Sequence, residues 1–259
     1  MKKILVSTIS YVNNSKPGSE IYTTYAKRLI NDVLSKTPYD IMVSTNRSDL
    51  FEEFKDVEMV CIKQVDLENH KTHVGAFNQL LKFSALQCVD SKYDWVLYLD
   101  CDAGFTESVD FSEIDRYLDG LDSENFDMSA LRTDATYDLS KEEFLNTTDF
   151  NSHPRPLFNN KFIFYGVQEE FSGAKLPSEH ILLLKNNEKL SIMGDVFESF
   201  CYIFESQDPS RIITYDMEAF EIGVSAHLAG YKVAEMTWSR QCDLFKVGFN
   251  ANNWEKIKL

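Results

Sequence analysis

The sequence predicts an α/β fold: a mostly parallel central sheet flanked by helices, in one domain whose second half is irregular. Its first hundred residues alternate short apolar segments with segments of helical spacing, which is the pattern of βαβ units. Residues 95–99 (WVLYL) form an unbroken apolar run, which suits an inner strand covered by helices on both faces. With 259 residues, 44% of them hydrophobic, the chain can bury a substantial core and is not of the disordered class.

The elements follow from the spacing of apolar residues and from the turn residues between them. In the first part, strands are expected at residues 3–9, 39–44, 58–62 and 95–99, and helices at 20–34, 49–54 and 75–89. The second part predicts strands at 126–131, 161–167 and 231–237, a loop at 151–160, and helices at 190–204 and 218–229. Gly230 is expected to end the last helix, and a polar tail is expected after residue 237.

Charge and cysteine content restrict the partners and the compartment. Lys and Arg number 26 against 41 Asp and Glu, so the formal charge of −15 disfavours non-specific binding to nucleic acid. The five cysteines are scattered and form no CxxC pair, which indicates free thiols in a reducing cytoplasm. Residues 1–10 read as a first strand and not as an export signal, and no segment approaches the length of a membrane span.

Two acids follow the apolar run directly, as Asp100 and Asp102, and we call residues 100–102 the acid turn. Parallel sheets place ligands beyond the carboxyl ends of their strands. Two carboxylates on one turn at that edge repel each other unless a cation lies between them. The acid turn therefore indicates a divalent metal and the phosphates that such a metal binds. The alternative is structural, because acids commonly end strands as turn formers.

The string YDWVLYLDCD and the preceding helix FNQLLKFSALQCV resemble the core of GT-A-type, DxD-containing nucleotide-sugar glycosyltransferases. The resemblance implies a Rossmann-like GT-A fold in which the acid turn holds Mn²⁺ or Mg²⁺ against the diphosphate of a nucleotide sugar. It implies that Asp102 is the main metal ligand and that Asp100 contacts the sugar or the ribose. Residues 1–105 would then form the donor-binding half and residues 106–259 the acceptor-binding and catalytic half of one compact domain.

The resemblance also assigns donor contacts. Asn78 and Lys82 are spaced i, i+4 and share one helix face, so Lys82 is expected to support the donor or the acid pair. A solvated helix lysine is the alternative. Thr8, Ser10 and Tyr11 end the first strand and begin the loop after it, where such a fold meets the nucleotide, and Tyr11 can stack on the base.

The acceptor side is expected to carry a carboxylate at the start of a late helix. Glu218 is the first candidate and Asp216 the second, although both also suit plain helix capping. Glu179 competes for this role, or it lines an acceptor pocket together with the neighbouring His180, for which a structural or surface role is the alternative. Many members of the family add a metal-binding His near the C-terminus, and here Asp243, Cys242 or water would take its place.

The predicted function is transfer of a sugar from a nucleotide-sugar donor to an acceptor hydroxyl. The acceptor would be a glycan, a small or lipid-linked molecule or, against the net charge, a hydroxymethylated DNA base. Two alternatives remain. A haloacid-dehalogenase-type phosphatase would use Asp100 as its nucleophile, although Ala103 and Gly104 depart from that motif. A non-catalytic nucleotide-sugar-binding protein would bind the donor without turnover.

Overall fold

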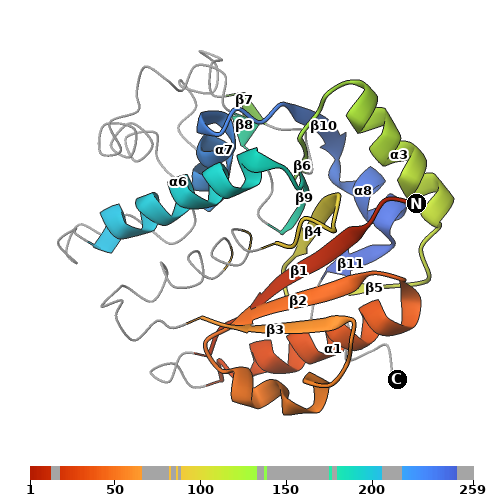
Figure 1. Ribbon diagram of the computed structural model, residues 1–259, viewed down its shortest axis with the longest axis vertical. Helices are drawn as coiled ribbons and strands as arrows, with labels where there is room; N and C mark the ends of the chain where they lie inside the picture. Colours follow the sequence, from red (N-terminus) through yellow and green to blue (C-terminus); the bar gives the residue numbers. More distant parts are fainter. Residues whose placement is uncertain are drawn as a thin grey trace.

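A seven-stranded sheet runs through the molecule in the order β10-β6-β9-β4-β1-β2-β3 (Figure 1). The computed structural model describes residues 1–12, 18–65, 82, 86, 89–132, 137–138, 175–176, 180–205 and 218–249, and every structural statement below concerns these. The strands of the sheet are β1 (Ile4–Ser10), β2 (Asp40–Thr45), β3 (Val60–Gln64), β4 (Trp95–Leu99), β6 (Met128–Arg132), β9 (Ile181–Lys185) and β10 (Val233–Thr237).

The sheet is mostly parallel, which confirms the predicted fold class. Strands β1, β2, β3 and β4 pair in parallel, as do β6 and β10. The exception is β9, which is antiparallel to both of its neighbours, β4 and β6. The central position of β4 explains its unbroken apolar sequence, because all five of its residues are fully buried.

Helices cover both faces of this sheet. On one face, α1 (Ile21–Lys36), α3 (Phe111–Ser123), α8 (Trp238–Phe245) and the 3₁₀ helix η1 (Ser48–Phe54) share a core with Trp95 and Leu97. On the other face, α6 (Glu188–Glu205) and α7 (Glu218–Leu228) share a core with Val96 and Tyr98. The periodicity of α1 accounts for its place, since its buried Ala26, Leu29, Ile30 and Val33 form one helical stripe.

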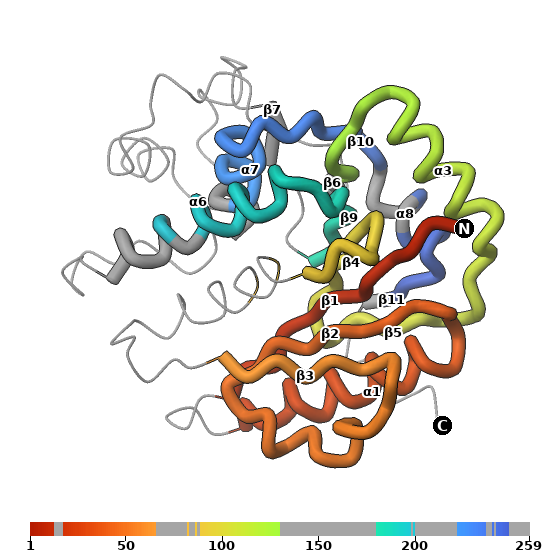
Figure 2. The backbone as a smooth tube through the Cα atoms, in the orientation of Figure 1, coloured from red at the N-terminus to blue at the C-terminus, as the bar shows by residue number. Residues whose placement is uncertain are grey.

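Two short sheets complete the described structure. Strand β5 (Ala103–Phe105), directly after the acid turn, pairs antiparallel with β11 (Val247–Phe249). Figure 2 shows this late segment returning to lie beside β5. Strands β7 (Tyr137–Asp138) and β8 (Lys175–Leu176) form the second pair. The polar tail expected after residue 237 is therefore wrong, because α8 and β11 occupy residues 238–249.

The other expectations agree with the structure or fall outside the described residues. The helices predicted at 20–34, 190–204 and 218–229 correspond to α1, α6 and α7, and Gly230 adopts a φ of 72° just beyond α7. Helix α3 and the strands β5, β7, β8, β9 and β11 were not predicted. The strand expected at 161–167, the loop at 151–160 and most of the helix at 75–89 lie outside the described ranges.

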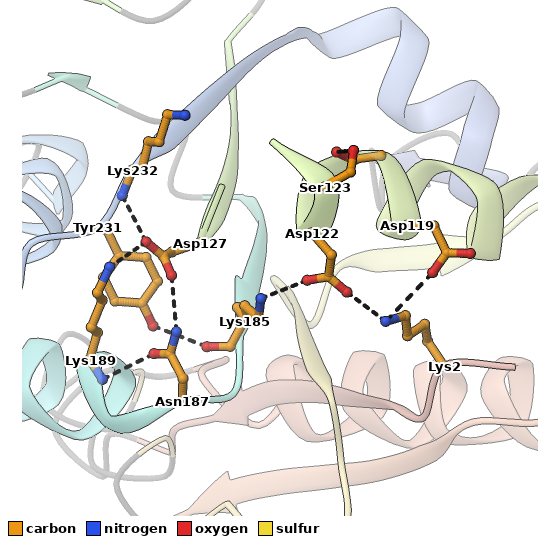
Figure 3. Close-up of polar contacts among 11 residues, drawn as sticks. Lys2, Asp119, Asp122, Ser123, Asp127, Lys185, Asn187, Lys189, Tyr231 and Lys232 are labelled. Atoms are coloured by element: carbon orange, nitrogen blue, oxygen red, sulfur yellow. Dashed lines mark hydrogen bonds and ion pairs between the residues drawn. The ribbon is translucent and has the colours of Figure 1, made fainter. Parts of the chain in front are cut away.

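Polar contacts close the edge of the sheet where the parallel strands begin (Figure 3). Asp127, just before β6, accepts hydrogen bonds from Lys189 Nζ at 2.6 Å, Asn187 Nδ2 at 3.0 Å and Lys232 N at 3.1 Å. Asp122 forms ion pairs with Lys2 Nζ at 2.5 Å and Lys185 Nζ at 2.7 Å. Each of these two acids is paired with lysine side chains, which is typical of a structural role. None of the described helices is both long and apolar enough to cross a membrane.

Candidate functional site

The strand order reverses between β1 and β4, and this point lies next to the acid turn. From β1 the chain continues to β2 and β3 on one side, whereas β4 and the later strands lie on the other side. In open α/β sheets, ligands bind beyond the carboxyl ends of the strands at such a reversal. Tyr11 follows β1 there, and Asp100 follows β4.

Three side chains from different segments hold the Asp100 carboxylate. Its Oδ1 accepts a hydrogen bond from the Tyr98 hydroxyl at 2.8 Å and pairs with Lys82 Nζ at 3.2 Å. Its Oδ2 lies 2.6 Å from His180 Nδ1. The backbone N–H of Asp100 also donates to the His180 carbonyl at 3.0 Å. Asp100 therefore has partners on both carboxylate oxygens.

Lys82 is buried, with only 2% of its side chain exposed, and its Nζ lies 4.7 Å from the centre of the Tyr98 ring. The structure thus brings Lys82 to the acid pair, as predicted, and it is not a solvated lysine. Burial alone would raise the pKa of Asp100. The charge of Lys82 and the hydrogen bonds from His180 and Tyr98 outweigh it and hold the pKa of Asp100 well below its usual value. Asp100 is therefore an ionised and compensated carboxylate.

Asp102 has a different environment although it lies only two residues away. Burial and the charge of Asp100 raise the pKa of the Asp102 carboxyl. Its own backbone N–H and the charges of His180 and Arg28 act in the opposite direction but are outweighed. Within the described ranges, no side chain forms a hydrogen bond or ion pair with its carboxylate. Its backbone is held instead, because Arg28 donates to the carbonyl oxygens of Asp102 at 3.0 Å and Ala103 at 3.1 Å. The pair thus consists of one satisfied carboxylate and one that gains from a cation.

The donor set fits a divalent ion that shares its coordination with a ligand. Within the described ranges, no three His, Cys, Asp or Glu side chains are grouped so as to hold a metal by themselves. Mg²⁺ in particular is commonly bound through one or two carboxylates plus substrate phosphates and not by an all-protein cage. Asp102 suits that mode, with Asp100 beside it.

The predicted donor contacts differ in accessibility. Thr8 and Ser10 are fully buried, and Ser10 Oγ lies 3.4 Å from Thr23 Oγ1. Tyr11 is only partly buried, which raises the pKa of its hydroxyl and leaves part of the ring accessible. Of these three residues, Tyr11 is therefore the one placed to meet a ligand. Asn78 lies outside the described residues.

The acceptor-side candidates are described only in part. Glu218 is the first residue of α7, as predicted, but its side chain is not described. Asp216 and Glu179 lie outside the described residues, although Glu179 directly precedes His180 in the chain. Asp243 is exposed on α8, ahead of β11, and β11 meets β5 with Val247 opposite Phe105 and Phe249 opposite Ala103. Its role as a metal ligand stays a prediction.

Sequence reasoning missed three residues of this site: His180, Tyr98 and Arg28. His180 was expected to line an acceptor pocket or to be structural, yet its ring contacts Asp100 across 80 positions of sequence. Tyr98 could have been found, because a strand residue two positions before Asp100 points to the same face. Arg28 carries no local signal, since it reaches the acid turn across 74 positions.

A cavity of about 360 Å³ opens at the other end of the sheet, lined by residues that include Lys3, Tyr39, Asp40 and Tyr93. These residues lie where β1, β2 and β4 begin, whereas the acid turn follows the end of β4. Among the described residues, this cavity therefore lies at the opposite edge of the sheet from the acid turn. We place the candidate site at the acid turn, because the unequal acid pair and its buried lysine converge there.

Comparisons with known proteins give little beyond the fold. No protein-family model matches the chain, and no curated protein matches it. Among solved structures, the chain is similar to the apo structure of WbbM, a bifunctional glycosyltransferase, with 13% identity and a TM-score of 0.43. The alignment covers 86% of this chain and 37% of the WbbM chain. A likeness at this level carries no argument about activity.

Proposed function

We propose that the chain is a metal-dependent glycosyltransferase that moves a sugar from a nucleotide-sugar donor to an acceptor hydroxyl. The observation that carries the proposal is the unequal acid pair at the strand-order reversal. Asp100 forms ion pairs with Lys82 and His180, whereas Asp102 forms none among the described residues, and the more distant charges of His180 and Arg28 do not prevent its pKa from being raised. Such a pair favours a cation that arrives with an anionic ligand, and a nucleoside diphosphate linked to a sugar is a ligand of this kind.

In this proposal Asp102 would hold Mn²⁺ or Mg²⁺ together with the donor diphosphate. When bound, such an ion supplies Lewis-acid stabilisation of the departing diphosphate. The residues of the chain bind the nucleotide-sugar donor and orient it. Asp100 is held rigidly by Lys82, Tyr98 and His180, so it can accept a sugar or ribose hydroxyl without moving. Tyr11, directly after β1, would contact the base.

The acceptor hydroxyl must lose a proton, and Glu218 at the start of α7 is our candidate for orienting it or accepting that proton. Asp216 and Glu179 are the second choices. We propose a glycan, a small molecule or a lipid-linked molecule as the acceptor. We also propose the cytoplasm as the compartment, on the basis of free thiols at Cys61, Cys101 and Cys242.

The sequence after the acid turn departs from the phosphatase alternative. That motif normally continues to Thr or Val, whereas Ala103 and Gly104 follow Asp102 here. A phosphatase of that type would also trap an aspartyl-phosphate on Asp100. We expect no such intermediate after incubation with a phosphate ester.

A thermal-shift screen of nucleotide sugars, with and without Mn²⁺, tests the proposal. Because a ligand that binds only the folded state raises its stability by mass action, a donor should raise Tm only when Mn²⁺ is present. Asp102→Asn should abolish the shift, whereas Asp119→Asn, at an exposed acid on α3, should keep it. Glu218→Gln should keep the shift and lose transfer.

Other outcomes would contradict the proposal. A full Mn²⁺-dependent shift in Asp102→Asn would remove the acid turn from the site. A shift without transfer to any acceptor, and without donor hydrolysis, would identify a binding protein. Release of phosphate from simple phosphate esters would favour the phosphatase.

A further inference from the structure

Helix α1 sends two cationic side chains to the backbone that follows the acid turn. Arg28 Nη2 donates to the carbonyl oxygens of both Asp102 and Ala103, at 3.0 and 3.1 Å. Eight residues later on the helix, Lys36 Nζ donates to the Phe105 carbonyl and pairs with Asp32 at 2.7 Å. The two cations thus hold β5 at its beginning and at its end.

The other edge of β5 is also occupied, because β11 pairs with it from Phe105 to Ala103. The backbone after the acid turn is therefore held between α1 and β11. Arg28 is the contact nearest the acids, and its single nitrogen Nη2 donates to both carbonyl oxygens. A lysine at the same position would bring the charge, but its shorter side chain ends before the position of Nη2.

We infer that Arg28 is a positioning residue for Asp102, which fixes the turn so that the Asp102 carboxylate faces the metal and the donor. The inference rests on the proposed function. Two effects act together. The hydrogen bonds to the Asp102 and Ala103 carbonyls restrict the backbone, and the nearby positive charge offsets part of the repulsion from Asp100. Residues that orient a metal ligand in this way typically change metal affinity by about 10- to 100-fold when they are removed.

Lys36 provides the matched control. It makes the same kind of contact from the same helix to the same strand, but at Phe105, away from the acids. If α1 merely anchors β5, loss of either cation should have the same consequences. If Arg28 positions Asp102, only its loss should weaken metal binding.

The experiment titrates Mn²⁺, alone and with UDP, and reads the free ion by electron paramagnetic resonance, with Tm measured in parallel. We expect Arg28→Met to weaken Mn²⁺ binding about 10- to 100-fold. Arg28→Lys, which keeps the charge, should weaken it less. Lys36→Met should lower Tm to a similar extent as Arg28→Met but leave the Mn²⁺ affinity unchanged. Asp102→Asn should abolish binding.

These measurements distinguish failure of the inference about Arg28 from failure of the proposed function. Suppose that Arg28→Met binds Mn²⁺ as tightly as the wild-type chain while Asp102→Asn binds none. This result would overturn the inference and leave the proposed function intact. Equal losses of affinity in Arg28→Met and Lys36→Met would also overturn it. If Arg28→Met does not fold, Arg28→Lys decides. The shorter lysine side chain cannot reproduce the Nη2 contacts to both carbonyl oxygens, so unchanged Mn²⁺ affinity in this variant would contradict positioning by Arg28. Absence of Mn²⁺ uptake by the wild-type chain would remove both the inference and the proposal.

Discussion

Asp100 and Asp102 lie on one turn, yet their carboxylates have opposite electrostatic surroundings. The pKa of Asp100 is held down by a buried lysine, a histidine and a tyrosine hydroxyl, against the effect of burial. The pKa of Asp102 is raised by burial and by Asp100 itself. A carboxyl group with a raised pKa is more costly to ionise in the folded chain than in the unfolded chain. If Asp102 binds the metal as proposed, its function and its contribution to stability oppose each other.

This opposition predicts that Asp102→Asn stabilises the metal-free chain at neutral pH. The pKa of Asp102 is higher in the folded chain than in the unfolded chain, so its ionisation lowers the free energy of unfolding. This destabilisation is absent at low pH and grows as pH rises through the folded pKa. Removing the charge should raise Tm by roughly 1 to 3 °C, since a change of about 1 kcal/mol moves Tm by about 2–4 °C at this chain length.

Differential scanning fluorimetry in EDTA, at several pH values, measures the difference in Tm between Asp102→Asn and the wild-type chain. The gain should shrink towards zero near pH 3, below the unfolded pKa of about 3.9. In saturating Mn²⁺ and donor, the wild-type chain should become the more stable of the two. A lower Tm for Asp102→Asn at pH 7 in EDTA would contradict the prediction.

At the scale of single residues, the sequence predicts contacts between residues that are close to each other along the chain. The acid turn follows its strand directly, and the helical spacing of residues 75–89 places Lys82 on a face that can reach it. His180 and Arg28 could not be predicted to join them, because contacts across 80 and 74 positions depend on how elements pack. Such contacts leave no periodic signal in either segment.

At the scale of elements, β9 determines the form of the site. Its direction is opposite to that of β4, so its first residues lie beside the end of β4, with Ile181 opposite Leu99. This orientation delivers His180 to Asp100. The apolar run at residues 181–184 indicates a buried strand, but its direction cannot be read, because side chains buried on both faces follow the same pattern either way.

The two helices that were not predicted, α3 and α8, have separate causes. Helix α3 had a usable signal, since Asp110 caps it and the buried Ile114, Leu118 and Leu121 follow helical spacing. Helix α8 had little sequence signal for a helix, because its sequence WSRQCDLF ends in only two buried apolar residues. Packing of Leu244 and Phe245 into the core holds it as a helix, and local propensity does not reveal that contact.

The contacts of Asp127 predict a purely structural role for the opposite edge of the sheet. Asp127→Ala should remove an acceptor shared by Lys189, Asn187 and the Lys232 N–H, which connects the start of α6 to the entries of β6 and β10. We expect a loss of about 1–3 kcal/mol in the free energy of unfolding. Activity per folded molecule should not change.

Urea unfolding measures this loss, and its pH dependence tests the cause. Despite its burial, the pKa of Asp127 is lowered by these partners, so its contribution should be present at neutral pH and decline as pH falls below about 4. The difference between wild type and Asp127→Ala should shrink accordingly. A variant that unfolds at the wild-type urea concentration would show that this network contributes nothing measurable.

At the scale of the whole molecule, the net charge of −15 separates the proposed acceptors. A chain this acidic repels duplex DNA over several ångströms, and repulsion is strongest at low salt. We therefore expect no binding to unmodified or hydroxymethylated duplex DNA, measured by fluorescence anisotropy at about 50 mM salt. Binding that weakens steeply with added salt would instead reveal a local basic strip and would favour a DNA acceptor.

The central sheet draws strands from both sides of residue 105, since β6, β9 and β10 continue the layer that β1 to β4 begin. The sheet thus unites the two sequence halves assigned to donor and acceptor. That assignment stays a prediction.

Because β9 pairs with β4 on one side and β6 on the other, the residue directly before it is anchored beside the acids by backbone contacts that do not depend on its own side chain. A substitution at position 180 can therefore alter the chemistry next to Asp100 while the hydrophobic interior keeps its packing.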